Sequence, residues 1–190
     1  MAFLLTDSAV PLPAETLPAL KITHFYGRPA RGPVYAYLRA YVYRGALCWC
    51  TTVFDAAPGP TARMGLAVSL EDGAGRYLFL SVGKAAGARL SLYRRGAAGA
   101  PDAPVRPLAA PAPRFFSGAD EQGEYWAAEG QIPAAAFTGV FGRAPAAGCL
   151  MPGNVFLYDE AEAAFGAAFP CPGAPGPCAA ALGTFLAVPY

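Results

Sequence analysis

Between Val34 and Tyr43 the sequence alternates strictly between two kinds of side chain. The aliphatic positions are Val34, Ala36, Leu38, Ala40 and Val42, and the positions between them are Tyr35, Tyr37, Arg39, Tyr41 and Tyr43. A period of two places successive side chains on opposite faces of a β-strand, whereas a helix needs a period of about 3.6 residues. The segment therefore predicts a strand with one aliphatic face and one tyrosine-rich face.

Other short runs of the same kind recur at the spacing of hairpins. Arg44-Gly45 predicts a tight turn into a return strand, and residues 71–75 predict a second turn between two alternating runs. The strands expected from this pattern cover residues 20–26, 34–43, 46–54, 64–70, 76–82, 90–92, 125–132, 155–158 and 184–188. Pro133 precedes a run of helix formers that predicts a short helix over Ala134–Phe141.

These elements predict an all-β protein. Roughly eight or nine short antiparallel strands, with one short capping helix, are typical of a β-sandwich or jelly roll. A length of 190 residues suits a single domain over residues 1–190. Within that domain we expect an N-terminal arm at 1–19, a surface loop rich in Ala and Pro at 96–113, and a Pro/Gly/Cys-rich loop around 170–178.

The composition argues against several classes of partner. There are 14 Lys and Arg against 13 Asp and Glu, and neither sign forms a long run, so nucleic acid and acidic lipid are not expected as partners. No segment approaches the roughly 18 apolar residues of a membrane helix, and the first residues lack the basic region of a signal peptide. Five cysteines without C-x-x-C spacing predict reduced thiols and a cytoplasmic location. The oligomeric state stays open.

No constellation of residues matches a known catalytic or metal-binding pattern. His24 is the single histidine, it lies in a predicted strand, and no serine sits in a G-x-S-x-G context, so we interpret His24 as a packed or edge-strand residue. The cysteine spacings do not fit a zinc site, and no glycine-rich phosphate loop is present. We therefore expect no enzyme activity, no metal and no cofactor.

Acidic residues gather in two predicted loops. The first group is Asp120, Glu121, Glu124 and Glu129, and the second is Asp159, Glu160 and Glu162. A glycosidase needs two carboxylates held about 5–9.5 Å apart across a cleft, and a calcium site needs several oxygens from one compact loop. We interpret both groups as solvated loop acids, with a small glycoside hydrolase and a calcium site in the second loop as alternatives.

The tyrosine-rich face of residues 34–43 is the most informative feature for binding. Flat rings on a rigid sheet can stack against the apolar face of a sugar. The alternative is that these rings form a packed inner face or a cross-strand ladder. Trp49 and Trp126 lie inside predicted strands, where core positions are more common than ligand platforms.

A set of segments in the C-terminal part of the chain carries a family resemblance. They are Tyr125-Trp126 followed by Ile132-Pro133, then Asn154-Val155-Phe156-Leu157-Tyr158-Asp159, then Phe165-Gly166-Ala167-Ala168-Phe169-Pro170, and finally Leu182-Gly183-Thr184-Phe185-Leu186. Their order and spacing resemble those of the carbohydrate-binding modules of family 9, in particular short stand-alone bacterial proteins. The resemblance covers residues 114–190.

The resemblance implies a jelly-roll sandwich that binds sugars or polysaccharide chain ends without a cofactor. The family's ligand-stacking tryptophan falls on Ala168 here, and the histidine that often opens the same stretch falls on Ala164. Phe165 or Phe169 would then have to supply the missing ring.

We therefore predict a non-catalytic carbohydrate-binding-like module whose ligand is a mono- or oligosaccharide. The alternative is a structural or protein-interaction sandwich that has lost sugar binding. The candidate ligand-binding residues are Tyr37, Tyr41, Phe116, Trp126, Asn154 and Phe169.

Overall fold

The computed structural model describes residues 2–27, 34–55, 57–96, 102–109, 111–171 and 182–190. The strands are β1 Ala2–Ser8, β2 Leu20–Lys21, β3 His24–Tyr26, β4 Ala36–Tyr43, β5 Ala46–Val53, β6 Ala62–Val68, β7 Arg76–Gly83, β8 Gly87–Arg94, β9 Ala103–Leu108, β10 Arg114–Asp120, β11 Gly123–Ile132, β12 Leu150–Asp159, β13 Phe165–Ala167 and β14 Gly183–Pro189. A 3-10 helix, η1, spans Ala14–Thr16, and α1 spans Ala134–Phe141. The predicted all-β class and the short helix are confirmed, with 14 strands described.

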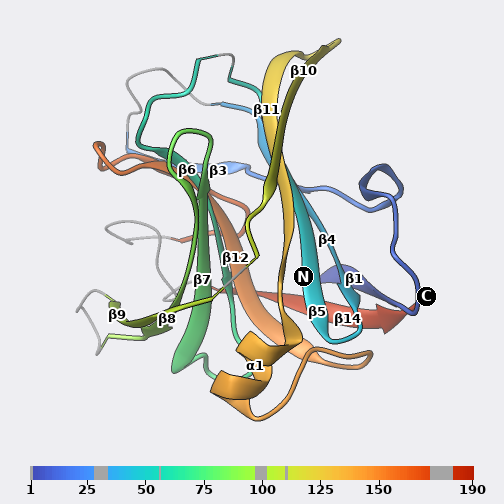
Figure 1. Ribbon diagram of the computed structural model, residues 1–190. Coiled ribbons are helices and arrows are strands. Elements are labelled where there is room, and N and C mark those ends of the chain that lie inside the picture. Colours follow the sequence, from blue (N-terminus) through green and yellow to red (C-terminus); the bar gives the residue numbers. More distant parts are fainter. Residues whose placement is uncertain (1, 28–33, 56, 97–101, 110, 172–181) are drawn as a thin grey trace.

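The strands form one mixed sheet that curls on itself (Figure 1). The order along it is β10-β11-β5-β4-β1-β14-β12-β6-β7-β8-β9. Strand β1 runs parallel to both of its neighbours, β4 and β14, and the other described pairs are antiparallel. The β4, β5 and β11 part faces the β6, β7 and β8 part across the core, and α1 closes one end (Figure 1). The layers are those of a sandwich.

The alternation along β4 decides which of its faces enters the core. Ala36, Leu38, Ala40 and Val42 are buried, while the tyrosines between them are half-buried on the outer face. Leucines and valines of β6, β7 and β12 meet the aliphatic face from the opposite layer. The aromatic side of β4 is therefore the outer side of the sandwich.

The β4–β5 turn shows why the hairpin forms at the predicted place. Arg44 and Gly45 have φ values of 51° and 73°, and positive φ at both central positions defines the turn that matches strand twist. A Cβ on Gly45 would lie 2.9 Å from the Cβ of Ala144, so glycine is also required sterically.

Two segments expected to lack strands contain them. The expected N-terminal arm at 1–19 contains β1, which was not predicted because its partners β4 and β14 are remote in sequence and no hairpin turn announces them. The expected surface loop at 96–113 contains β9, an exposed edge strand whose side chains show no apolar alternation. Strand β10 was missed as well, and it is exposed along most of its length.

The strand expected over 20–26 is divided into β2 and β3 because the chain changes partners there. The N–H of Ile22 still donates to Ala36 O of the β4 side at 2.9 Å, but the N–H of Thr23 donates to Ala167 O beside β13 at 3.2 Å. Most of the loop expected around 170–178 lies outside the described residues, as does Cys178. Cys48, Cys50 and Cys149 are free thiols. No helix in the described part of the chain has the length and apolarity needed to cross a membrane.

Candidate functional site

Two depressions bring candidate ligand-binding side chains together. The first, which we call the sheet-face groove, runs over the outer face of β4, β5 and β11, and its lining includes Tyr37, Arg39, Tyr41, Cys50, Phe116 and Glu129. The second, which we call the end pocket, opens at the end of the sandwich opposite α1, and its lining includes Phe25, Asp55, Trp126, Leu157, Asp159 and Glu162.

The sheet-face groove contains three of the predicted site residues. Tyr37 and Tyr41 face it because they occupy outward positions of β4, and Phe116 reaches it from β10. Residues 12–15 form one wall, and residues 111–116 form part of the other. The groove is therefore a trough between two irregular segments with a sheet as its floor.

Groups of the chain itself already cover the rings of the groove. The guanidinium carbon of Arg39 lies 5.2 Å from the centre of the Tyr37 ring, and that of Arg114 lies 5.9 Å from the centre of the Phe116 ring. Tyr41 stands opposite Cys48 in the strand register, and burial raises the pKa of its hydroxyl. A ligand that stacks here would have to displace these contacts.

The groove is polar and its thiols are poor nucleophiles. Arg114 and Glu129 form an ion pair at 2.8 Å, with three-quarters of the arginine side chain exposed. Burial raises the pKa of Cys50 to about 11, and the nearby Glu129 carboxylate adds to the effect. Burial likewise raises the pKa of Cys48. Because the thiolate is the reactive form, these residues do not form a cysteine nucleophile at neutral pH.

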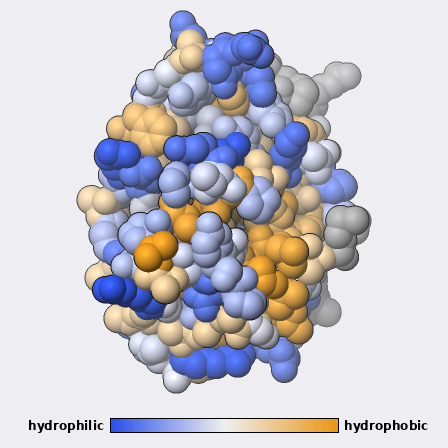
Figure 2. Space-filling model, turned by 90° about the vertical axis from the view of Figure 1, so that its right-hand side faces the viewer, coloured by the Kyte–Doolittle hydropathy of each residue, from blue (hydrophilic) through white to orange (hydrophobic). Residues whose placement is uncertain are grey.

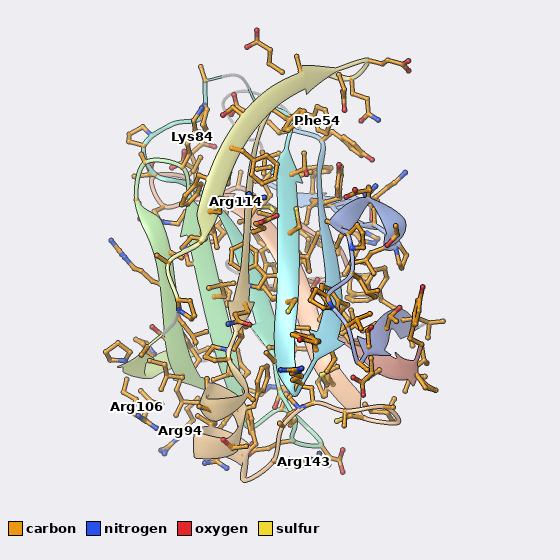
Figure 3. All side chains as sticks on the ribbon, turned by 45° about the vertical axis from the view of Figure 1, so that its right-hand side comes forward. Phe54, Lys84, Arg94, Arg106, Arg114 and Arg143 are labelled. Atoms are coloured by element: carbon orange, nitrogen blue, oxygen red, sulfur yellow. The ribbon has the colours of Figure 1, made fainter. Side chains whose placement is uncertain are left out.

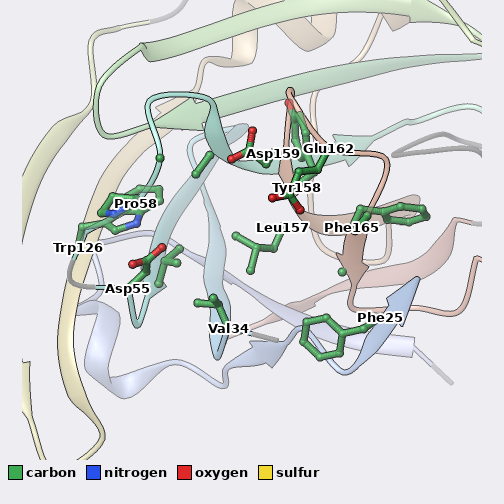
Figure 4. A pocket seen from close by; sticks show the side chains of 15 residues that line it. Phe25, Val34, Asp55, Pro58, Trp126, Leu157, Tyr158, Asp159, Glu162 and Phe165 are labelled. Carbon is green, nitrogen blue, oxygen red and sulfur yellow. The ribbon is translucent and has the colours of Figure 1, made fainter. Parts of the chain in front are cut away.

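The end pocket presents one exposed ring at its mouth (Figure 4). Phe25 of β3 is 40% exposed, and it stands opposite Gly166 of β13 in the strand register. A Cβ on Gly166 would lie 2.6 Å from the Ile22 side chain and 3.1 Å from the Phe25 ring, so the absence of a side chain at Gly166 leaves room for both. Within the described part of the chain, no arginine, lysine or second ring stacks on Phe25. Its outer face is available to a ligand.

Trp126 supplies a hydrogen-bond donor at the pocket wall. The side chain is 0% exposed, and its Nε1 has no hydrogen-bond partner among the described residues. A buried donor without a partner costs roughly 1–3 kcal/mol, and native proteins rarely leave one unsatisfied without a water or ligand. Figure 4 shows the indole beside Pro58 and on the same side as Asp55, across the pocket from Asp159 and Glu162.

Carboxylates supply acceptors on the other side. Oδ1 of Asp159 accepts hydrogen bonds from the Thr61 hydroxyl and from the N–H of Ala161, the latter at 2.9 Å. Oδ2 of Asp159 is turned toward Gly59, where a Cβ would lie only 3.2 Å away. Asp55 and Glu162 also line the pocket. The cavity volume of the end pocket is about 100 Å³. One water molecule needs roughly 10–15 Å³ of cavity volume, so the pocket has room for several waters or for one small ring.

Asn154 and Phe169 lie in neither depression. Asn154 is fully buried, its Oδ1 accepts from the N–H groups of Val155 and Phe169 at 2.8 and 2.9 Å, and its Nδ2 donates to Phe169 O at 3.1 Å. The Phe169 ring lies 6.0 Å from the Phe185 ring, packed against the core. These two residues anchor the segment after β13 to β12.

The carboxylates of Asp159 and Glu160, at the end of β12, have different surroundings. Asp159 faces the end pocket, whereas Glu160 receives two hydrogen bonds from the guanidinium of Arg63, at 2.8 and 3.0 Å. Arg63 is 2% exposed, and its charge lowers the pKa of Glu160. In the residues that the structure describes, no group of three or more His, Cys, Asp or Glu side chains is placed to hold a metal ion. The alternative of a calcium site in this loop gains no support.

Solved structures share the fold over essentially the whole chain. A family 9 carbohydrate-binding module from Caldicellulosiruptor kristjanssonii, in complex with glucose, superposes with a TM-score of 0.60 at 10% identity, over 100% of this chain and 97% of that one. Its complex with cellotriose gives 0.59 at 10% identity, over 100% and 95%. A protein from Bacteroides uniformis with a candidate carbohydrate-binding assignment gives 0.65 at 15% identity, over 98% of both chains.

No family model matches the sequence, and no curated protein matches it. The fold shared with these solved structures confirms the resemblance to family 9 modules that the C-terminal segments suggested. In fold, the likeness also covers the N-terminal half of the chain, where the sequence showed only a matching strand pattern.

Proposed function

We propose that the protein is a non-catalytic sugar-binding module and that the end pocket takes one sugar ring. The observation that carries the proposal is the Phe25 ring, which is 40% exposed in the end pocket and has no arginine, lysine or second ring over it among the described residues. The same pocket is lined by Trp126, whose buried N–H has no partner among the described residues. A polyhydroxylated ring suits such a place because it offers both an apolar face and hydroxyl groups.

Each chemical feature of a pyranose has a counterpart in the pocket. The apolar ring face stacks on Phe25, a hydroxyl oxygen accepts the hydrogen bond from Trp126 Nε1, and a hydroxyl hydrogen is donated to Asp159 Oδ2. A hydrogen bond to a charged acceptor is stronger than one between neutral groups, so Asp159 would fix the orientation of the ring. Leu157 and Val34 complete an apolar lining.

The fold supports the choice of ligand class. Among the solved structures with this fold are complexes with glucose and with cellotriose. These two sugars are therefore the first probes, and other mono- and oligosaccharides follow.

The sheet-face groove is a second candidate location for the sugar. The groove contains Tyr37, Tyr41 and Phe116. The guanidinium of Arg39 lies over the Tyr37 ring, and that of Arg114 lies over the Phe116 ring. The groove also contains buried donors without partners among the described residues, Arg39 Nε and Trp49 Nε1. The end pocket is preferred because, among the described residues, no guanidinium lies over the Phe25 ring.

Titration of the full chain with glucose and cellotriose, followed by calorimetry and by NMR, tests the function and its location. Trp126→Phe keeps an aromatic ring and removes the N–H, so the affinity should fall by the ~0.5–1.5 kcal/mol of one hydrogen bond, or roughly 2- to 12-fold. Asp159→Asn should weaken binding further. Tyr41→Phe removes a hydroxyl from the groove and should leave the affinity unchanged.

Two results would redirect the proposal. If no sugar binds at millimolar concentration, the protein is the structural or interaction sandwich that has lost sugar binding. If incubation with cello-oligosaccharides releases new reducing ends, and Asp159→Asn stops the release, the carboxylates of the end pocket form a glycoside hydrolase site instead.

A further inference from the structure

The main path of the curled sheet ends at two strands, β9 and β10, and among the described residues each of them is paired on one side only. An unpaired edge is a template for another strand, and proteins that avoid such pairing interrupt the edge with proline, bulges or charge. Strand β9 carries Pro104 and Pro107, and its register against β8 shifts at Leu92/Tyr93. The β9 edge is therefore blocked by its own sequence.

The β10 edge has neither proline nor bulge, and its charged residues, Arg114 and Asp120, lie only at its two ends. Its sequence is Arg114-Phe115-Phe116-Ser117-Gly118-Ala119-Asp120. It contains no proline, its pairing with β11 is regular throughout, and Phe116 is 38% exposed. The β10–β11 hairpin extends beyond the body of the sandwich (Figure 1), which leaves room for another strand beside it.

The turn of this hairpin fixes which backbone groups point away from β11. Asp120 pairs with Gly123 across a two-residue turn, so these residues exchange both hydrogen bonds. Because hydrogen-bonded and non-hydrogen-bonded pairs alternate, the N–H and C=O groups of Phe115, Ser117 and Ala119 point to the open edge. A new strand would have to pair with these residues.

The sequence of β10 is complementary to itself in one antiparallel register. We propose that β10 pairs with β10 of a second copy of the chain about a twofold axis at Ser117. This register joins the backbones of Phe115 and Ala119 of the partner subunit, and those of the two Ser117 residues, through the groups that point outward. It is an isologous contact, which closes as a dimer.

The side chains favour the same register. Arg114 stands opposite Asp120 of the partner subunit, so each end of the paired strands carries one pair of opposite charges. Phe116 stands opposite Gly118 of the partner subunit, a large residue against a small one. Tyr125 already lies over Gly118, since a Cβ on Gly118 would meet its hydroxyl at 2.6 Å. The Phe116 ring thus meets a second ring and not a gap.

The contact is short, so the dimer should be reversible and concentration-dependent. One strand pair buries much less than the ~1,200–2,000 Å² of a stable complex. Sedimentation velocity of the full chain from about 1 to 500 μM should therefore show a monomer that converts to a dimer, with a dissociation constant in the micromolar range or above.

Charge reversal tests the register. Asp120→Arg places two arginines at each end of the dimer, and Arg114→Glu places two carboxylates there, so each variant alone should dimerise at least about tenfold more weakly. An equimolar mixture restores opposite charges at both ends in a heterodimer, and it should recover the dimer. Arg106→Glu on β9, which lies well away from Arg114 in Figure 3, is the matched control and should dimerise like the wild type.

A backbone variant separates pairing from charge. Ser117→Pro removes an N–H that points to the open edge and leaves the ladder to β11 intact, so it should be monomeric with an unchanged circular dichroism spectrum. If the wild type stays monomeric at about 500 μM, or if the mixed charge variants fail to recover the dimer that each lost, the proposal is wrong.

Discussion

Replacing Phe25 by alanine should remove most of the sugar affinity at little cost in stability. Stacking on an aromatic ring contributes about 1–3 kcal/mol for a nucleic-acid base, and a similar value for a sugar corresponds to a roughly 5- to 150-fold loss of affinity. A fully buried phenylalanine costs about 3–5 kcal/mol when it is truncated to alanine. Because Phe25 is 40% exposed, we expect a destabilisation of only about 1–2 kcal/mol.

Calorimetric titration with glucose or cellotriose measures the affinity, and urea unfolding measures the stability. Phe25→Tyr keeps the ring and should bind within about threefold of the wild type. Phe116→Ala is the matched control, since Phe116 is 38% exposed and lies in the sheet-face groove. Unchanged affinity in Phe25→Ala, or a loss of affinity in Phe116→Ala, would refute the assignment of the sugar to the end pocket.

Glu160→Gln leaves the buried Arg63 guanidinium without its counter-charge and should lower the free energy of unfolding at pH 7 by about 2–3 kcal/mol, less than for a fully buried pair because Glu160 is 42% exposed. The hydrogen bonds and charge of Arg63 lower the pKa of Glu160, so the wild-type advantage is complete above the pKa of the unfolded carboxyl and is lost as the pH falls through the lower pKa of the folded state; an advantage that does not decrease on acidification would contradict this. Gly139→Ala adds a methyl group to α1 with no atom within 4 Å, and it should raise the melting temperature by roughly 1–4 °C. Cys50 should react with a disulfide reagent at pH 8 far more slowly in the folded protein than in urea, because burial raises its pKa to about 11.

The part of the fold that the sequence predicts is the part held by local pattern. Strand β4 is predicted because its residues alternate between core and surface side chains. The β4–β5 hairpin is predicted because Arg44-Gly45 favours a tight turn. In both cases the signal lies within a few residues of the element that it specifies.

The strands that escaped prediction lack such a signal. Strand β1 pairs in parallel with β4 and β14, so its partners are set by the closure of the sheet and not by a neighbouring turn. Strands β9 and β10 end the main path of the sheet, and most of their side chains are exposed on both faces. An edge strand that buries little has no hydrophobic alternation to reveal it.

The end pocket could not be predicted for a different reason. Its ring, donor and acceptor come from Phe25, Trp126 and Asp159, which are remote from one another in the sequence and meet only through the order of the strands. Trp126 was a candidate on resemblance, and Asp159 was singled out only as a loop acid. Phe25 gave no signal of its own, since a phenylalanine in a predicted strand is ordinarily a core residue.

The position of Phe25 also bears on the alanine that stands in place of the family's stacking tryptophan. Ala168 is 8% exposed and packs within the core, with its N–H bonded to Val155 O at 2.9 Å, so its side chain leaves no gap at the end pocket. Two residues earlier, Gly166 pairs directly with Phe25 of β3. An aromatic ring thus reaches the pocket from the strand next to the segment in which the resemblance aligns Ala168 with the family's tryptophan. Phe25→Leu removes the ring and keeps an apolar side chain opposite Gly166, whereas a side chain at Gly166 would first meet the buried Ile22. A loss of sugar affinity in Phe25→Leu, without loss of the fold by circular dichroism, is the result expected if the ring supplies the stacking surface.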